Sequence, residues 1–334
     1  MEAIAPAHQS AKVIAPEHAG DLRPAVLAGP DQLSQSARAK IIELSGPRPI
    51  RFLTEMFLNW AVIAALIALG IWADNLVVTI LCIIGIGTRQ MVFGLLMHEQ
   101  VHRLGARSRF ADWWINVFAV YPLLVTTVED YAAVHLSHHK YFFTDKDPDF
   151  VRKSGPDWSI PTSLRSFLWI VLKDLTGINT LGLIRGKTAP KDVTEFRRRN
   201  PTPKLLRWIF FAAVALALTL ANAWTVFLVY WVVPLLTVTQ LFVRWIAVIE
   251  HKYNVPNATV HSVTPLIRLK WWQKILLPDF NFAQHVYHHM HPGVSFANLP
   301  AVHAIYKAEG LVDETAIFNG QGSFLRYLVK RKAG

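Results

Sequence analysis

The sequence has a single cysteine, Cys82, and this residue lies inside an apolar run. A disulfide framework and a thiolate metal site both need several cysteines, so neither can be built here. Charged residues are also scarce, at 17% of the chain, where an ordinary soluble domain carries about 25%. With 52% hydrophobic residues, the chain is not disordered either, and these proportions point to a single membrane-embedded unit.

The N-terminal segment lacks the apolar stretch of a secretory signal peptide. Residues 1–35 are rich in Ala, Pro, Ser and Gln, and we expect them to form a flexible tail. We expect one membrane-embedded domain over residues 36–310, followed by a basic C-terminal segment over residues 311–334.

Acidic residues are the minority among the charged side chains, and the formal net charge is +11. Residues 140–207 hold 14 of the 34 Lys and Arg residues, while the connectors at 74–75 and 221–223 hold none. This asymmetry is typical of a membrane protein whose basic segments lie on the cytoplasmic side. We expect no nucleic-acid partner, because the basic residues belong to no nucleic-acid-binding motif.

Long apolar runs are abundant. Four of them approach the roughly 20 residues that a helix needs to cross about 30 Å of hydrocarbon, and they lie at about 52–73, 76–97, 204–220 and 224–249. A shorter run at 113–128 contains Pro122, so we expect a re-entrant or interfacial helix there. The pattern predicts an all-α integral membrane protein with four transmembrane helices and both termini in the cytoplasm. In a bacterium this would be the inner membrane.

Two arginines, Arg89 and Arg244, lie within or near the ends of these apolar runs. A charge at the bilayer centre costs roughly 2.5–3.5 kcal/mol. We therefore expect both side chains to face protein or to reach the membrane surface, in a structural role.

Histidine is abundant, with 14 residues, and eight of them fall into three clusters. The clusters read His98-Glu-Gln-Val-His102, His135-Leu-Ser-His138-His139 and His285-Val-Tyr-His288-His289. Spacings of three and four residues place the imidazoles of a cluster on one face of a helix. Two copies of the pattern H-x-x-H-H are far from a chance expectation. Each cluster follows a predicted membrane element on the same side of the bilayer, which indicates a shared metal site.

The ligand type alone does not select the metal, because imidazole suits Zn, Cu, Fe and Ni. A structural zinc site takes four protein ligands and a catalytic one takes three. Eight or nine histidines exceed one such site and match two metals with open positions. Two irons that react with dioxygen would explain the excess, and copper stays open.

The three clusters, in this order and with a long apolar insertion between the second and third, resemble those of the membrane fatty acid desaturase superfamily. That superfamily includes acyl-lipid and sphingolipid desaturases, lipid hydroxylases, and carotenoid ketolases or hydroxylases. The sequences Asp-Pro-Asp at 147–149, His-Pro-Gly-Val at 291–294 and Asn-Leu-Pro at 298–300 are similar to stretches of that family. The resemblance covers roughly residues 50–310 and implies a cytoplasmic helical cap on four transmembrane helices, with a non-haem di-iron site.

The resemblance also implies which residues bind the two Fe ions. The family's eight box histidines are carried over as catalytic residues and metal ligands to His98, His102, His135, His138, His139, His285, His288 and His289. The Glu250-His251 pair after the last crossing is similar to one in sphingolipid-type desaturases, which makes His251 a candidate ninth ligand. An interfacial histidine bonded to lipid or backbone is the alternative for His251.

The remaining histidines lack this spacing, and we expect them to be surface or outer residues: His8, His18, His261, His291 and His303. Metal-bound imidazoles usually donate their second N–H to a carboxylate or carbonyl, and we expect Glu250 and Asp149 in that role. We expect the other nearby acids to be solvated or to cap helices: Glu99, Glu129, Asp130, Asp145 and Asp147. Four tryptophans between the second and third clusters suit either a substrate tunnel or interfacial packing: Trp208, Trp224, Trp231 and Trp245.

An unactivated C–H bond resists acids, bases and nucleophiles, so its chemistry needs a metal with dioxygen as co-substrate. The first interpretation is an oxygen-dependent di-iron desaturase that introduces a double bond into an acyl chain or similar lipid. A hydroxylase or ketolase of a carotenoid, sterol or other hydrophobic substrate is the alternative, because small shifts in substrate placement separate the outcomes. A metal transporter or zinc hydrolase is disfavoured, since a transporter places ionisable ligands near the bilayer midplane.

The sequence shows no flavin, haem or iron–sulfur motif. We therefore expect an external electron donor, either a ferredoxin-type protein or a cytochrome with its reductase. Such a donor would dock on the basic cytoplasmic face.

Overall fold

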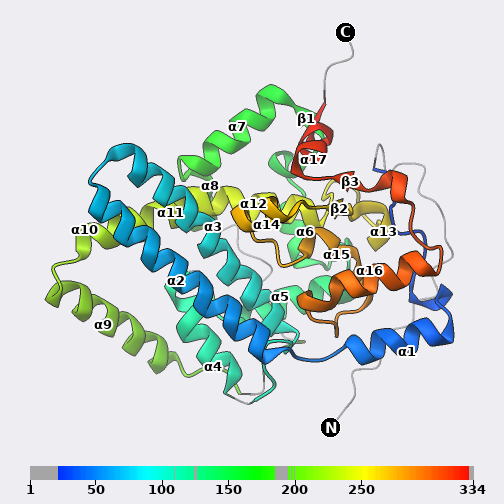
Figure 1. Cartoon of the computed structure of the whole chain (residues 1–334), viewed down its shortest axis with the longest axis horizontal. Coiled ribbons are helices and arrows are strands. Elements are labelled where there is room, and N and C mark those ends of the chain that lie inside the picture. The colour runs from blue at the N-terminus through cyan, green and yellow to red at the C-terminus, as the bar shows by residue number, and fades with distance from the viewer. Residues whose placement is uncertain are drawn as a thin grey trace.

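A computed structural model describes residues 22–108, 110–123, 126–184, 195–196, 198 and 200–330. The described chain is mostly helical (Figure 1), as the sequence predicts. Its strands have two residues each and form two parallel pairs: β1 (Thr162–Ser163) with β4 (Val329–Lys330), and β2 (Ile267–Arg268) with β3 (Phe318–Asn319). Long helices extend to one side of the molecule, and shorter helices gather around their other ends.

Three helical segments are long and apolar enough to cross a membrane: α2 (Pro49–Ala73), α3 (Leu76–Val101) and the segment Trp224–Glu250. The third segment is built from α10 (Trp224–Phe227), the π-helical turn η5 (Leu228–Val232), α11 (Val233–Leu236) and α12 (Val238–Glu250). These segments confirm three of the predicted membrane helices. The protein is therefore a multi-pass membrane protein.

The hairpin turn between α2 and α3 is defined by two residues. Asp74 adopts a left-handed conformation with φ 43°, and this ends α2. The side chain of Asn75 then caps α3 by accepting hydrogen bonds from the backbone N–H groups of Val77 and Val78. The turn lies at the opposite end of α3 from His98.

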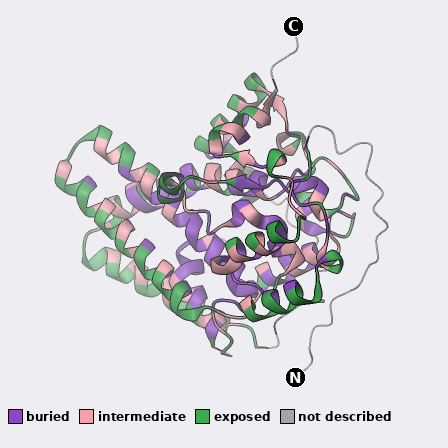
Figure 2. Ribbon diagram, turned by 45° about the vertical axis from the view of Figure 1, so that its right-hand side comes forward, coloured by how far each residue is buried: buried purple, intermediate pink, exposed green. Residues whose placement is uncertain are grey.

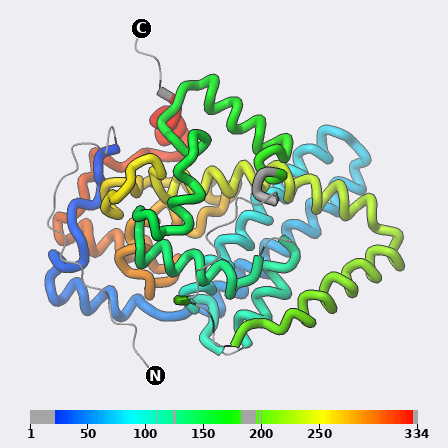
Figure 3. The backbone as a smooth tube through the Cα atoms, turned by 180° about the vertical axis from the view of Figure 1, so that it is seen from behind, coloured from blue at the N-terminus to red at the C-terminus, as the bar shows by residue number. Residues whose placement is uncertain are grey.

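α9 (Lys204–Leu220) is the fourth predicted crossing, and it is a helix of 17 residues. At about 1.5 Å per residue it is about 26 Å long, slightly less than the roughly 30 Å of a hydrocarbon core. None of its residues is buried, and it forms an outer edge of the molecule in both Figure 1 and Figure 3.

The predicted re-entrant segment is interrupted. Its first part contains α4 (Ala111–Ile115), the π-helical turn η2 (Asn116–Val120) and the 3-10 turn η3 (Tyr121–Leu123). A new helix, α5 (Val128–Lys140), begins after the Thr127 side chain, which caps it. The two parts meet at 90°, as in a broken span or a re-entrant loop. The expected segment over residues 113–128 is thus helical up to Leu123, and α5 begins at Val128, where that segment was expected to end.

Two indole hydrogen bonds join α2 and η5 to the bent segment. Trp60 Nε1 donates to the Phe118 carbonyl, and Trp231 Nε1 donates to the Pro122 carbonyl, both at 2.8 Å. The two indoles stack with ring centroids 5.3 Å apart. This contact holds the bent segment against α2 and η5, so Trp231 serves helix packing.

The other three tryptophans of uncertain role differ from Trp231. Trp208 and Trp224 are 72% and 43% exposed, as in an interfacial belt. Trp245 donates from Nε1 to Gln321 Oε1 at 2.9 Å. These positions favour packing and interfacial roles.

Most of the remaining elements form a cap around the histidine-bearing ends of α3, α5 and α12. Its helices are α1 (Gln35–Leu44), α6 (Pro148–Lys153), α7 (Leu164–Leu175), α13 (Val260–Val263), α14 (Trp271–Leu276), α15 (His285–Met290), α16 (Leu299–Ala308) and α17 (Gln321–Leu328). Its 3-10 turns are η1 (Pro30–Gln32), η4 (Pro156–Trp158), η6 (Phe282–Gln284), η7 (Phe296–Asn298) and η8 (Glu314–Ala316). α8 (Ile178–Ile184) instead lies beside α11, where Thr180 Oγ1 donates to the Leu236 carbonyl. Figure 2 shows buried residues gathered in the interior and exposed residues along the outer surfaces of the long helices.

Both described ends of the chain pack onto the cap. The backbone N–H of Leu27 donates to Leu311 O at 3.0 Å, and that of Asp313 donates to Ala25 O at 2.8 Å. At the other end, α17 buries Phe324 in the main core. Among the described residues, packing onto the cap therefore includes residues 22–35 and continues past residue 310. Residues 1–21 of the predicted tail lie outside the described residues.

Candidate metal centre

Four chain segments carry the predicted metal ligands into one place. His98 lies in the last turn of α3, and His102 directly follows that helix. The second histidine cluster lies on α5 and the third on α15. His251 is the first residue after α12, where the backbone becomes extended. The structure brings all nine imidazoles together.

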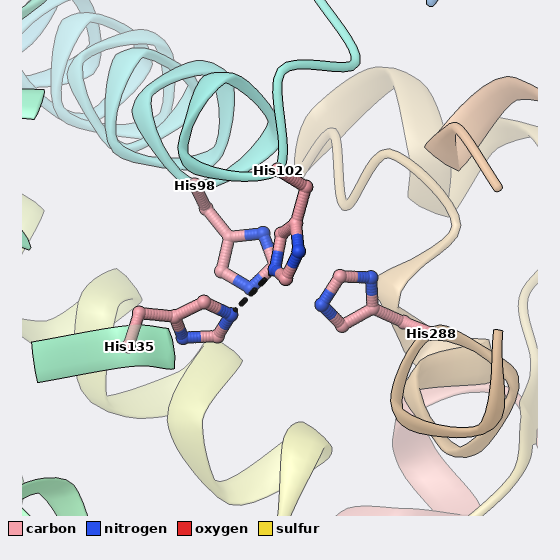
Figure 4. Close-up of side chains that lie close together, drawn as sticks. All are labelled: His98, His102, His135 and His288. Atoms are coloured by element: carbon pink, nitrogen blue, oxygen red, sulfur yellow. Dashed lines mark hydrogen bonds between the residues drawn. The ribbon is translucent and has the colours of Figure 1, made fainter. Parts of the chain in front are cut away.

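The first group of imidazoles comprises His98, His102, His135, His139 and His288. Candidate ligand atoms of four of them lie within 4.8 Å of one another, and their rings point from α3, α5 and α15 toward a common centre (Figure 4). His135 Nε2 is 2.9 Å from His102 Nε2. His139 joins this group, since its Nε2 lies 3.0 Å from His135 Nε2 and 3.1 Å from His288 Nε2.

The second group comprises His138, His251, His285 and His289. His251 Nε2 lies 3.4 Å from His138 Nε2 and 2.9 Å from His289 Nε2. His285 joins through its Nε2, which is 3.1 Å from His289 Nε2. The two groups touch where the rings of His139 and His289 stack, with centroids 4.2 Å apart.

The spacing of these nitrogens fits metal ions. Around an ion with metal–nitrogen bonds of about 2.0–2.1 Å, neighbouring ligand atoms in tetrahedral or octahedral arrangements lie about 2.9–3.4 Å apart. The Nε2 atoms of both groups show the same separations, from 2.9 to 3.4 Å. In addition, both ring nitrogens of His98 are buried without a hydrogen-bond partner among the described residues, an arrangement that needs an explanation in a folded protein. The two groups therefore fit a di-metal site.

The imidazoles outside the membrane helices are kept unprotonated. Burial, with a further contribution from neighbouring imidazoles, lowers the pKa well below 6.5 for His102, His251, His285, His288 and His289. A neutral imidazole retains the lone pair that binds a metal.

Two side chains contact the second group from outside. His138 Nδ1 lies 2.7 Å from Asp147 Oδ2, and His251 Nδ1 lies 2.9 Å from Thr264 Oγ1. In both histidines Nδ1 faces outward and Nε2 faces the cluster. Asp147 also accepts a hydrogen bond from the Phe143 backbone N–H at 2.9 Å. Such contacts fix the tautomer and orientation of metal-binding histidines.

The prediction that Asp149 accepts a hydrogen bond from a metal-binding imidazole is wrong. Asp149 pairs with Arg152 Nη2 at 2.6 Å and with Lys153 Nζ at 2.7 Å, and it accepts a hydrogen bond from Tyr253 Oη at 3.2 Å. Burial raises the pKa of Asp149, but Lys153 and Arg152 outweigh burial and hold it below its usual range. The carboxylate is therefore already neutralised by cations and does not face an imidazole.

Asp147, and not Asp149, is the carboxylate that contacts the outward-facing nitrogen of a cluster imidazole. It was expected to be solvated or to cap a helix, and it does cap α6, since its Oδ1 accepts from the backbone N–H groups of Asp149 and Phe150. The sequence contained a signal for this, because an Asp before Pro148 at a helix start is typical of an N-cap. Its second oxygen is free to reach His138. Nothing in the sequence identified Thr264, which lies 13 residues after the histidine that it contacts.

Two further acids near the clusters are buried and bonded rather than solvated. Glu99 accepts a hydrogen bond from the Phe296 backbone N–H at 3.2 Å. Glu129 accepts from the Thr202 backbone N–H at 2.7 Å and from Asn116 Nδ2 at 2.8 Å. These contacts tie α3 to η7, and α5 to Thr202 and Asn116.

Three histidines outside the clusters lie away from both groups. His291 Nε2 is 2.9 Å from Tyr306 Oη, and His303 Nδ1 is 2.9 Å from Tyr287 Oη. His261 has no predicted ligand among its contacts, and one of its ring carbons lies near Gly29. The two other predicted non-ligands, His8 and His18, lie outside the described residues.

Both arginines of the apolar runs contact protein, as predicted. Arg244 forms a two-point ion pair with Asp174, with distances of 2.5 and 3.1 Å. Arg89 Nη2 donates to the Ile275 carbonyl at 2.5 Å. The first contact joins α12 to α7, and the second joins α3 to α14.

Comparison with known proteins gives two matches. Over 83 residues, the chain is 28% identical to the sphingolipid delta(4)-desaturase DES1 of Bos taurus. That match covers 24% of this chain and 26% of the bovine protein, so the chain spans about a quarter of the length of this relative. The family model described as fatty acid desaturase matches residues 73–316, which include both histidine groups. The chain therefore belongs to the fatty acid desaturase family.

Proposed function

We propose that this protein is an oxygen-dependent, non-haem di-iron desaturase that introduces a double bond into the acyl chain of a lipid. The observation that supports this most is the convergence of nine imidazoles at the end of apolar helices. A donor set of this size exceeds one zinc or copper site and suits two metals with open positions. Its place at the membrane helices suits a substrate that enters from the bilayer.

The two histidine groups define where the irons would bind. The first group would hold one Fe ion and the second group the other. Together the two irons would supply the redox chemistry that couples reduction of dioxygen to removal of hydrogen from an unactivated C–H bond. The balanced reaction converts CH2–CH2, O2, two electrons and two protons into CH=CH and two molecules of water.

The chain's own residues position the metals and exclude water. The ring of Phe282 packs edge-on against His98 with centroids 4.7 Å apart, and that of Tyr131 stacks on His135 at 5.5 Å. Apolar walls of this kind keep bulk water from the reacting groups. They also suit the apolar chain of a lipid.

The cap side is the cytoplasmic side in this proposal. α6, which carries Arg152 and Lys153, packs against α5 on the cap side, while the turns at 74–75 and 221–223 lack Lys and Arg. The positive-inside rule then places the cap in the cytoplasm. An external ferredoxin-type or cytochrome donor would deliver electrons there.

The similarity to a sphingolipid desaturase guides the choice of the first substrates to test. A ceramide or a related long-chain lipid is therefore the first substrate to test, followed by acyl lipids. The reaction is tested by expressing the protein in cells that lack it and analysing lipids by mass spectrometry. Loss of two hydrogen atoms from a lipid chain supports a desaturase. Gain of an oxygen atom, or conversion of a CH2 to a carbonyl, would instead support a hydroxylase or ketolase.

The metal is tested on the same preparations. Two equivalents of iron per chain in the purified active protein support the proposal. Full activity in protein that contains only zinc or no metal contradicts it.

A further inference from the structure

The side chain of Glu250 lies where the two histidine groups face each other. One of its carboxylate oxygens, a nitrogen of His98 and a nitrogen of His285 all lie within 4.8 Å of one another. His98 belongs to the first group and His285 to the second. Among the described acidic residues, Glu250 alone combines with imidazoles of both groups in this way.

The end of α12 explains how neighbouring residues reach different places. Glu250 is the last residue of the helix, and His251 has an extended backbone with φ −150° and ψ 153°. This change directs the His251 side chain toward His138 and His289. The Glu250 side chain is directed toward His98 and His285. One helix end thus delivers two donor groups to the site.

The His285 contact of Glu250 does not supply a hydrogen bond to its carboxylate. One of its carboxylate oxygens lies 3.9 Å from His285 Nδ1, which is too long for a hydrogen bond. The side chain is only 14% exposed, and burying an unpaired carboxylate is costly. The C-terminal end of a helix also carries negative partial charge, which disfavours an anion further.

Two other carboxylates near the site, Asp147 and Asp149, have donors. Asp147 accepts from His138 and from three backbone N–H groups. Asp149 is paired with two cations. Lys153, which exerts an electrostatic influence on Glu250, is already bonded to Asp149 and Tyr253 at 2.7 and 2.9 Å. Glu250 is thus left facing imidazoles whose nitrogens also lack partners, namely His98 and His285 Nδ1.

A cation between these groups would satisfy all of them. Nine neutral imidazoles bring no negative charge to a site for two cations, so an anionic oxygen donor is electrostatically favourable. We propose that Glu250 is a tenth, anionic donor of the metal site, placed between the two histidine groups. This inference rests on the proposed di-iron function and adds a carboxylate ligand to it.

A weaker role would be that Glu250 only orients His285, as Asp147 orients His138. Substitution by glutamine separates the role of metal ligand from the role of hydrogen-bond acceptor for His285. The amide oxygen of Glu250→Gln can still accept a hydrogen bond from His285 Nδ1, but it carries no charge to give to a metal. A ligand is therefore sensitive to Glu250→Gln, while an orienting acceptor is not.

The test is anaerobic titration of the purified full-length protein with Fe(II), with bound iron measured by elemental analysis and its environment by Mössbauer spectroscopy. Glu99→Gln is the matched control. Glu99 is a buried glutamate that directly follows His98, just as Glu250 directly precedes His251. Its Oε1 instead accepts a hydrogen bond from the Phe296 backbone N–H. Circular dichroism and gel filtration in detergent check that each variant is folded.

We expect Glu250→Gln to weaken the binding of at least one of the two irons about tenfold or more and to change the Mössbauer spectrum. Glu99→Gln should retain both the affinity and the spectrum of the wild type. If Glu250→Gln binds two irons with wild-type affinity and spectrum, the ligand role is overturned while the proposed function stands. If only Glu250→Ala is impaired, the side chain merely orients His285, and the ligand role is again overturned. A wild-type protein that binds no iron overturns both proposals.

Discussion

The two histidine groups are held in different ways. Four of the five imidazoles of the first group lie in α3 and α5 or directly follow α3, and the described residues show no side chain outside the clusters hydrogen-bonded to any of the five. The second group instead receives outer contacts from Asp147 and Thr264. One of its members, His251, lies just outside a helix, in extended backbone.

This difference shows two ways to orient a metal-binding imidazole. In the first group, His98 and His102 are four residues apart, as are His135 and His139, so helix geometry places each pair on one face. In the second group the chain leaves the helix at His251, and a hydroxyl supplies the orientation that helical backbone no longer gives. The second group should therefore depend more on the cap.

The largest effect on activity is expected from the loss of one imidazole from either group, because both groups are needed for turnover. His138→Ala in the second group and His288→Ala in the first should each abolish product formation while leaving the protein in the membrane. Each substitution removes one donor from a site whose two metals act together. Lipid analysis and membrane fractionation measure the two outcomes.

His261→Ala is the control for this pair, because His261 lies outside both groups. It should retain activity near that of the wild type. Near-wild-type turnover in His138→Ala or His288→Ala would remove that residue from the site.

A smaller effect, on iron content, is expected when His251 is changed, the candidate ligand that lies outside the three clusters. His251→Ala should lower the iron occupancy of the second group, because His251 Nε2 lies close to both His138 and His289. His303→Ala should leave occupancy unchanged, since His303 contacts Tyr287 instead. Elemental analysis of both variants decides the matter, and equal iron content would cancel the role of His251 as a ninth ligand.

The sequence predicted the parts of this site that follow from helix periodicity. Spacings of three and four residues identified the imidazoles of the clusters, and apolar runs identified α2, α3 and Trp224–Glu250. These signals are local. The 90° bend between α5 and the segment that precedes it was not predicted, because an apolar run does not reveal the angle at which successive helices meet.

The outer contacts were harder to predict because they depend on distant packing. Asp149 and Asp147 are two residues apart in the same Asp-Pro-Asp sequence, and their roles are separated by Lys153 and Arg152, which neutralise Asp149. Thr264 has no sequence pattern at all. Its role appears only once the segment after α12 folds back onto His251. Side chains that support a site from another segment therefore need the tertiary structure.

The support of the second group can be tested directly at Asp147. Asp147→Asn removes one of the two carboxylate oxygens as an acceptor, so His138 Nδ1 or the backbone N–H groups lose a partner. We expect iron affinity of the second group to fall about 10–100-fold, with the first group less affected. Iron titration followed by Mössbauer spectroscopy measures the two environments separately.

Asp145→Asn is the matched control, because Asp145 is exposed and lies two residues away. It should bind iron as the wild type does. Thr264→Val should give a smaller loss than Asp147→Asn, since a neutral hydroxyl contact is weaker than one to a carboxylate. Equal losses from the two groups in Asp147→Asn would contradict the separate support of the second group.

The smallest effect is expected at a histidine outside both groups, where only stability is at stake. Burial lowers the pKa of His303 below 6.5 in the folded protein. As the pH falls below about 6.5, the unfolded chain takes up the proton first, so folding stability decreases. His303→Gln removes this proton uptake and should make the loss of stability between pH 7.5 and about pH 5.5 shallower, by under about 1 kcal/mol because solvent screens a partly exposed group. Thermal unfolding in detergent at the two pH values measures this change in folding stability. An unchanged pH dependence in His303→Gln would show that His303 does not contribute to it. The acid sensitivity of the protein would then come from the two histidine groups themselves.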